Sequence, residues 1–271
     1  MFYKKIIIAD NFPQGFEPSQ IQIPDGRRAD FEKLASSKAA LVLKFNILFK
    51  AKVYSIVLKK YFIRNISDFF KSLILPSRAQ RAFKAGQMLI ANGFLTPPMA
   101  AYGRNFLMTM EIQGSTQFFI LLGTLPAEKK KQMVEQFAQT IGKMHDKGIF
   151  HGDLRLGNIL VKENSLCHSS KTPSGERSEA ESKNLLKQEN FQFYFLDNER
   201  TKKFEVIPWK LRIKNLVQIN IDRNNVDEND RKLFFDIYLA QQTKPIDAHK
   251  LAEDVIAKTN ARLKKKAPLS F

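Results

Sequence analysis

Cysteine is nearly absent from this sequence, and long apolar runs are absent altogether. The 271 residues include one cysteine, Cys167, so an internal disulfide cannot form. No apolar run approaches the roughly 18 residues that a membrane-spanning helix requires. The first ten residues hold an apolar run too short for a signal-peptide core, and no small-residue cleavage site follows. Together these features favour a cytosolic protein.

Acidic residues are scarce relative to basic ones. The sequence has 44 Lys and Arg against 27 Asp and Glu, which leaves a formal net charge of +17. Hydrophobic content of 44% and charged content of 26% otherwise match a soluble globular protein. The excess indicates a polyanionic partner such as nucleic acid, an anionic membrane or a phosphorylated substrate. The alternative is a basic surface that is only solvated.

Apolar periodicity predicts a mixture of strands and helices, which is the α+β class. Two strands are expected at 41–49 and 53–61, because β-branched and aromatic residues dominate both segments. Helices are expected at 77–92 and 127–147, since apolar residues recur there at helical spacing and a glycine follows each. The second helix is expected to bury the stripe Val134, Phe137, Ile141 and Met144.

The rest of the chain divides into strands, one polar segment and a helical end. Further strands are expected at 106–111, at 117–122 and at the start of 191–199. Segment 163–190 is rich in Ser, Lys, Glu and Asn without apolar periodicity, so we expect an exposed, disordered insertion. The remainder after that last strand is expected to be helical.

The chemically informative segment is HGDLRLGNIL at 151–160, which follows a predicted helix and precedes a predicted strand. Asp153 and Asn158 have the D-x-x-x-x-N spacing of a kinase catalytic loop, and Asp197 ends a later apolar strand. Phosphoryl transfer needs a carboxylate to receive or orient the acceptor's proton. It also needs an amide oxygen and a second carboxylate to hold metal ions.

We therefore predict that Asp153 is the catalytic base and that Asn158 and Asp197 are metal ligands. In such a loop a histidine more often supports the backbone than does chemistry, so His151 is predicted to be structural. The alternative is a chance loop in an unrelated α/β domain.

Lys59 ends the tetrapeptide IVLK at 56–59, which matches the V-A-I-K pattern of a kinase strand. The lysine of that pattern pairs with the α- and β-phosphates of ATP. Lys60 is the rival, but strand alternation places neighbouring side chains on opposite faces. We favour Lys59. The other interpretation of both lysines is a solvated strand end.

Two parts of an ordinary protein kinase are missing. No glycine occurs between Gly26 and Gly86, so no Gly-rich loop covers the phosphates, although Ser36 and Ser37 could form a substitute turn. No acid occurs between Asp68 and Glu111, so the helix after the lysine strand lacks its usual glutamate. Lys59 must therefore find another partner, or be held by phosphate and Asp197.

Five segments resemble the lipopolysaccharide core kinases of Gram-negative bacteria, the Kdo and heptose kinase family. They are VLKKY at 57–61, SRAQRAFKAGQMLIANGFLTPP at 77–98, MHDKGIFHGDLRLGNILV at 144–161, FYFLDNERTKKF at 193–204 and WKLRIKNLVQIN at 209–220. The resemblance implies a two-lobed protein-kinase-like fold that uses ATP and Mg²⁺. It also implies a sugar hydroxyl acceptor on the lipopolysaccharide inner core, at the cytosolic face of the inner membrane.

The resemblance also implies roles for particular residues. Lys59 would bind phosphate, Asp153 would act as base, and Asn158 and Asp197 would bind metal. Glu111 would lie at the inter-lobe hinge where adenine binds. We expect a small β-rich N-terminal lobe at 1–108 and a larger helical C-terminal lobe at 109–271.

Basic residues cluster just after the predicted metal aspartate, where a kinase docks its acceptor. The cluster comprises Arg200, Lys202, Lys203, Lys210, Arg212 and Lys214, around Trp209. A second basic and aromatic stretch at 59–84 suits an anionic membrane surface, or equally a helix pair with a solvated face. We expect an anionic glycolipid substrate and a peripheral location at that membrane.

Two other functions stay open at this point, and a third rests on charge alone. One is an atypical small-molecule or protein kinase with a different anionic acceptor. The other is a pseudokinase that only binds, which the missing glutamate and glycines favour and the three catalytic residues oppose. Nucleic-acid binding is the weakest alternative, because only the net charge supports it.

Overall fold

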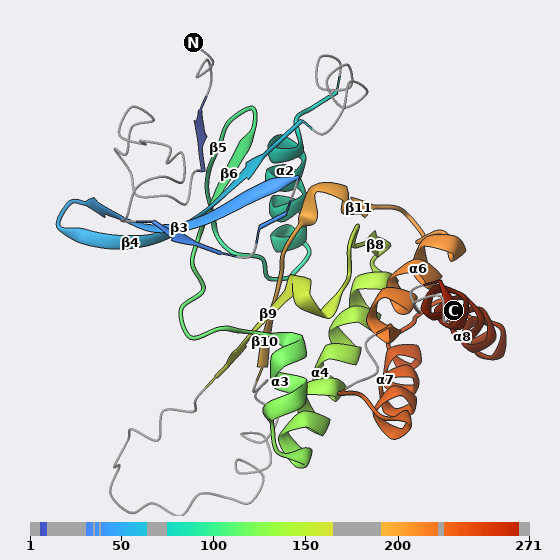
Figure 1. Cartoon of the computed structure of the whole chain (residues 1–271). Helices are drawn as coiled ribbons and strands as arrows, with labels where there is room; N and C mark the ends of the chain where they lie inside the picture. The colour runs from blue at the N-terminus through green and yellow to red at the C-terminus, as the bar shows by residue number, and fades with distance from the viewer. Residues whose placement is uncertain are drawn as a thin grey trace, which may run out of the picture.

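The computed structural model describes residues 6–9, 31–34, 36–37, 39–63, 75–164, 191–221 and 225–265. A six-stranded antiparallel sheet with one helix against it forms the N-terminal part, and helices dominate the C-terminal part (Figure 1). The predicted α+β class is confirmed. Among the described residues, no helix combines the length and apolar content needed to cross a bilayer.

The six-stranded sheet has the order β1-β5-β6-β4-β3-β2. Its strands are β1 (Ile7–Ile8), β2 (Glu32–Lys33), β3 (Ala40–Phe49), β4 (Lys52–Tyr61), β5 (Met99–Tyr102) and β6 (Phe106–Met110). The long β3–β4 hairpin matches the two predicted strands. Lys50 and Ala51 connect them with φ of 48° and 58°, a left-handed two-residue turn that suits the right-handed twist of paired strands.

Helix α2 (Arg78–Ala91) packs against this sheet and continues toward the helical lobe, as Figure 1 shows. Ser77 caps its first turn by accepting a hydrogen bond from the backbone of Gln80. Ala79 and Ala82 are buried against the sheet, and their small side chains let the helix approach closely. The boundaries agree with the helix predicted at 77–92.

The prediction of a strand at 117–122 is wrong. Only β7 (Thr116–Gln117) is extended there, and α3 (Phe118–Thr124) follows immediately. Phe118 and Leu122, four residues apart, are both buried, whereas Phe119 and Ile120 are exposed. That is the spacing of a helix face, and packing on this face overrides the β-propensity of the sequence FFILL.

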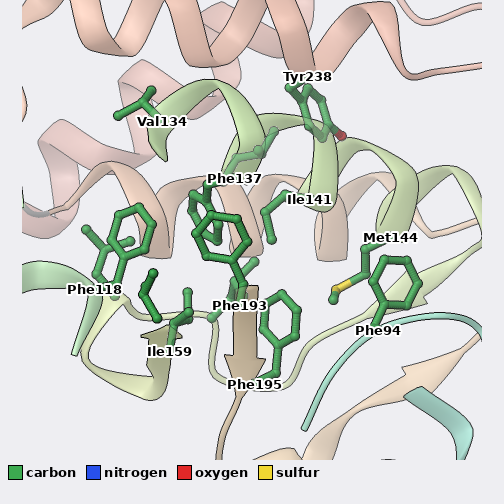
Figure 2. Packing of buried hydrophobic residues seen from close by; sticks show 14 of the residues in the cluster. Phe94, Phe118, Val134, Phe137, Ile141, Met144, Ile159, Phe193, Phe195 and Tyr238 are labelled. Carbon is green, nitrogen blue, oxygen red and sulfur yellow. The ribbon is translucent and has the colours of Figure 1, made fainter. Parts of the chain in front are cut away.

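The helical lobe is built from α4 (Ala127–Asp146), α6 (Trp209–Asn220), α7 (Glu228–Ala240) and α8 (Ala248–Lys264). The predicted stripe of α4 is confirmed, because Val134, Phe137, Ile141 and Met144 are all buried. Figure 2 shows Phe137 at the centre of this core, close to Phe118 and Phe193. This core supports the polar loops that carry Asp153 and Asp197.

Strands β9 (Ile159–Glu163) and β10 (Phe191–Phe195) form an antiparallel hairpin, and β7 pairs with β9. Nearly all of the expected insertion at 163–190 lies outside the described residues. Glu163 and Phe191 are direct partners in the hairpin, so its two ends already lie side by side.

Deletion of residues 166–186 is therefore expected to preserve both fold and activity. A shorter loop lowers the entropic cost of closing the hairpin, which raises the free energy of unfolding by about 1 kcal/mol. Urea unfolding of the full chain and the deletion variant checks this. A large loss of stability would show that the deleted segment packs on the fold.

His145 on α4 lies in a buried polar network of the helical lobe. Its Nδ1 lies 2.9 Å from the Tyr238 hydroxyl, and its Nε2 lies 3.2 Å from Asn215 Oδ1. A neutral imidazole fits this network by accepting from Tyr238 and donating to Asn215. Burial, helped by the nearby positive charge of Arg212, lowers the pKa of His145 to about 3.

The free energy of unfolding should therefore decrease as the pH falls. The unfolded chain takes up a proton on this histidine near pH 6.5, whereas the folded protein resists until about pH 3. Between pH 7.5 and 5 this residue should remove on the order of 2 kcal/mol of stability. Urea unfolding should show a smaller loss in His145→Gln, and an unchanged loss in the exposed control His249→Gln. If all three proteins lost the same stability between pH 7.5 and 5, His145 could not be the group responsible.

Candidate active site

The loop at 151–155, here called the HGD loop, connects β8 (Ile149–Phe150) to the 3-10 turn η2 (Leu156–Asn158). Strand β9 follows this turn directly. This turn brings the two predicted residues together. The Asn158 amide nitrogen donates to the Asp153 backbone carbonyl at 2.9 Å and to Asp153 Oδ2 at 3.1 Å. With that nitrogen committed to Asp153, the amide oxygen of Asn158 remains as the atom that could bind a metal ion.

Helix α6 holds the HGD loop through two buried side chains that the sequence analysis missed. Asn215 accepts from the His151 backbone N–H at 3.1 Å and donates to its carbonyl at 2.6 Å. Gln218 accepts from the Leu154 N–H at 3.2 Å and donates to Asp153 Oδ1 at 2.9 Å. The sequence signal that could have identified them is that Asn215 and Gln218 lie three residues apart among the apolar residues of this helix.

Arg155 was also missed by the sequence analysis. Its side chain is 61% exposed, and its Nε donates to Asp153 Oδ1 at 2.8 Å. The Asp153 carboxylate therefore lies beside a largely exposed cation.

Gly152 is required by a close approach of two backbones. A Cβ at this position would lie 2.2 Å from Arg200 Cβ and 2.7 Å from the Arg200 carbonyl carbon. The segment after Asp197 thus packs directly on the HGD loop, and no larger residue fits between them.

His151 is fully buried, its ring lies 5.7 Å from the Phe195 ring between their centres, and both of its ring nitrogens have polar partners. Its Nε2 lies 3.0 Å from both the Leu196 carbonyl and Asn198 Oδ1, while its Nδ1 accepts from the Asp153 N–H at 3.3 Å. Burial lowers its pKa, so the ring stays neutral. These contacts join the HGD loop to the Asp197 loop, which agrees with the predicted structural role.

Asp197 follows β10 and leads into the 3-10 turn η3 (Asn198–Arg200). It adopts a left-handed backbone conformation with φ of 58°, which aspartate tolerates better than most residues because its short polar side chain can hydrogen-bond locally. Its carboxylate forms an ion pair with Lys59 on β4. The structure thus brings Lys59 to the predicted metal aspartate, while alternation along β4 turns Lys60 to the other face.

Glu111 follows β6, at the connection between the sheet and the helical lobe. Its carboxylate pairs with Lys44 at 2.7 Å, and its backbone N–H donates to the Ser55 carbonyl at 2.9 Å. The pair with Lys44 lowers the pKa of Glu111. Both groups are used within the sheet, so adenine recognition by Glu111 stays a prediction.

Ser36 and Ser37 lie between β2 and β3, where the predicted substitute turn was expected. The Ser36 hydroxyl donates to the Leu34 carbonyl at 2.9 Å and accepts from the Val42 N–H at 3.0 Å. Ser37 pairs with Ala40 in a β-bridge. Serine hydroxyls therefore shape this turn in a stretch that has no glycine.

Arg212 does not belong to the basic surface cluster, which corrects the prediction. It is only 6% exposed, and its guanidinium donates to Gln242 at 2.7 Å and to the Tyr238 hydroxyl. Arg212 lies on the face of α6 that packs into the helical lobe. The sequence of this helix mixes apolar and basic residues, so its buried face is hard to identify from periodicity.

Five members of the cluster are exposed, namely Arg200, Lys202, Lys203, Lys210 and Lys214. Lys202 and Lys203 form β11, which pairs with β8 directly before the HGD loop. Lys203 also donates to Asn92 at 2.7 Å. The basic cluster therefore lies next to the loop that carries Asp153.

The available ligand atoms suit Mg²⁺. The Asn158 amide oxygen and the Asp197 carboxylate are hard oxygen ligands, which Mg²⁺ prefers, and nucleotide phosphates and water complete such a site. Lys59 next to Asp197 places a positive charge where a phosphate could bind. Asp153, held by Gln218 and Asn158, is a separate carboxylate of the kind that phosphoryl transfer needs.

A sequence profile of the "Lipopolysaccharide kinase (Kdo/WaaP) family" matches residues 98–238, just over half of the chain. The chain belongs to this lipopolysaccharide kinase family. The matched region includes Asp153, Asn158 and Asp197, and it excludes Lys59. Membership makes the protein a phosphotransferase, as the spacing of these residues predicted.

WaaP, solved in complex with acyl carrier protein, is similar to this chain in structure. Its TM-score is 0.61 at 16% identity, with 96% of this chain and 98% of that chain covered. This likeness confirms the kinase-like fold. The Rio2 kinase from Chaetomium thermophilum matches at a TM-score of 0.43 and 14% identity, over 85% of this chain and 71% of that chain.

A curated relative matches part of the chain. The KEOPS complex subunit Bud32 of Pyrococcus abyssi (strain GE5 / Orsay) is 33% identical over 60 residues, which is 22% of this chain and 27% of Bud32. The chain thus spans about a quarter of the length of that relative.

Proposed function

We propose that this protein transfers the γ-phosphate of ATP, with Mg²⁺, to a sugar hydroxyl of the lipopolysaccharide inner core, on either Kdo or heptose. One observation carries the proposal. The loop with the Asp153–Asn158 contact and the loop with the Lys59–Asp197 pair are joined directly, because the Leu196 N–H donates to the Asn158 carbonyl at 2.9 Å. Transfer of labelled phosphate from ATP to lipopolysaccharide lacking its core phosphate tests it.

Asp153 acts on the acceptor in this proposal. Its carboxylate orients the sugar hydroxyl and receives its proton as the oxygen attacks the γ-phosphorus. The new O–P bond forms while the bond to the β–γ bridging oxygen breaks, and ADP leaves. Gln218 and Arg155 both donate to Asp153 Oδ1, which holds the carboxylate in one orientation.

The nucleotide is held by the other three groups. Lys59 neutralises phosphate charge, and Asn158 and Asp197 would hold Mg²⁺ through their oxygens. The metal ion supplies neutralisation of the charge shared between the β- and γ-phosphates. The contribution of the chain is therefore mainly positioning and electrostatics, which is what phosphoryl transfer requires.

The acceptor site is proposed to be the five-residue exposed basic cluster beside the HGD loop. An inner-core glycolipid is anionic, and each basic residue near an anionic surface contributes on the order of 1 kcal/mol. The same charge supports a peripheral location at the inner face of the inner membrane. Nucleic acid is not part of this proposal.

Reversal of Lys202, Lys210 and Lys214 to Glu should raise the KM for lipopolysaccharide roughly 100-fold at low salt. Nucleotide affinity should change little, because exposed charges are screened over about 8 Å at physiological ionic strength. The wild-type KM for lipopolysaccharide should rise steeply with NaCl and that of the variant less steeply. Steady-state kinetics against lipopolysaccharide and a neutral sugar acceptor measures both effects.

A variant with the same change in net charge provides the control. Lys250, Lys258 and Lys264 are exposed on α8, and their reversal to Glu should leave the KM near that of the wild type. If both triple variants lose affinity equally, net charge rather than this surface attracts the acceptor.

A further inference from the structure

Helix α2 lacks a glutamate for Lys59, but it begins with a different ionic contact to the metal-binding loop. Two nitrogens of the Arg78 guanidinium donate hydrogen bonds to Glu199 Oε1, Nη2 at 2.6 Å and Nε at 3.1 Å. Glu199 lies two residues after Asp197, inside the 3-10 turn η3. The helix of the N-terminal lobe is thus tied directly to the segment that presents Asp197.

The contact is shielded from water. The side chains of Arg78 and Glu199 are 23% and 10% exposed. Arg78 also lies 4.7 Å from the centre of the Tyr61 ring, and its Nη1 is 3.4 Å from the Ala39 carbonyl in the turn before β3. A two-nitrogen contact of this burial is stronger and more directional than an exposed ion pair.

Other contacts hold the two residues before Glu199. Asp197 pairs with Lys59, and Asn198 donates to Thr96 Oγ1 at 2.9 Å while it contacts His151. Asp197 itself adopts a left-handed conformation, which few residues other than glycine, asparagine and aspartate adopt. Arg78 holds the far side of this turn.

We propose that Arg78 and Glu199 are positioning residues that fix Asp197 relative to α2. Protein kinases tie the corresponding helix to the active site through a pair between the strand lysine and a helix glutamate. Here the signs are exchanged, because the helix carries the cation and the metal loop carries the carboxylate. Lys59 pairs with Asp197 instead, so α2 needs no acid.

The effect of this pair on catalysis rests on the proposed function, but its effect on the order of η3 does not. Arg78→Gln should loosen η3 in the protein without nucleotide, which hydrogen exchange measures as faster exchange of amides 198–201. With nucleotide, the Mg²⁺ concentration for half-maximal binding of a non-hydrolysable ATP analogue should rise roughly tenfold, and kcat should fall roughly tenfold to 100-fold. Affinity for the metal-free analogue should not change, since Arg78 is engaged by Glu199.

Lys130→Gln is the matched control. Lys130 pairs with Asp230 at 2.5 Å between α4 and α7, and the side chains are 19% and 13% exposed. Its loss should lower the melting temperature about as much as Arg78→Gln does, without changing exchange at 198–201 or the Mg²⁺ requirement.

The double variant Arg78→Gln with Glu199→Gln separates positioning from stability. Removing the stranded carboxylate should restore most of the melting temperature, whereas the raised Mg²⁺ requirement should persist. Recovery of both, or unchanged exchange at 198–201 in Arg78→Gln, would overturn the inference. A wild-type protein that transfers no phosphate to lipopolysaccharide would count against the proposed function alone, because the exchange measurement needs no acceptor.

Discussion

Asp153→Asn is expected to abolish phosphate transfer, with kcat lowered by roughly 10³-fold or more. The substitution keeps the size of the side chain and removes the group that receives the acceptor's proton. Nucleotide affinity should stay within a few-fold of the wild type, because Lys59, Asn158 and Asp197 remain in place. Steady-state kinetics and calorimetric titration with a non-hydrolysable ATP analogue measure the two effects separately.

Asp236→Asn serves as the control, since Asp236 is an exposed carboxylate on α7 that pairs with Lys232. It should retain full activity. If Asp153→Asn kept activity within a few-fold of the wild type, Asp153 could not be the base. The hydrogen bonds from Gln218 and Arg155 would then have only a structural meaning.

Asp197→Ala is expected to remove the Mg²⁺ dependence of nucleotide binding. A hard cation that also binds phosphates needs this carboxylate oxygen, and no other carboxylate is predicted as a ligand. The substitution also strands Lys59 without its ion-pair partner. The wild type should bind nucleotide much more tightly with Mg²⁺ than without it, and this ratio should fall to about one in the variant.

Asn158→Ala should lower the same ratio less, because it removes a neutral ligand. Equal nucleotide affinity with and without Mg²⁺ in the wild type would favour a pseudokinase that binds without catalysis. Titration calorimetry of the three proteins, each with Mg²⁺ and with a chelator, distinguishes these outcomes.

The contacts among the proposed catalytic residues could be predicted from sequence because the spacing of these residues is typical of a kinase catalytic loop. Asp153 and Asn158 are five residues apart, and a single 3-10 turn brings them into contact. Lys59 could be preferred over Lys60 because strand geometry alternates side chains, and its pairing with Asp197 agrees with that preference. Local periodicity likewise predicted α2 and α4 to within a residue or two.

Other features depend on contacts between distant segments. Gln218 lies 65 residues from Asp153, and Arg78 lies 121 residues from Glu199, so no local pattern links them. Arg212 was assigned to the surface from its charge, yet α6 turns it inward to a buried hydroxyl. In α3, the aromatic and β-branched sequence favours a strand, and burial of one helical face decides otherwise.

The most direct test is mass spectrometry of the core oligosaccharide after dephosphorylated lipopolysaccharide is incubated with ATP, Mg²⁺ and either wild-type protein or Asp153→Asn. The account predicts that the wild type adds a single phosphate to an inner-core sugar and that Asp153→Asn adds none. Fragmentation of the product then identifies Kdo or heptose as the acceptor. No phosphate gained with the wild type, or equal gain with both proteins, would contradict the account.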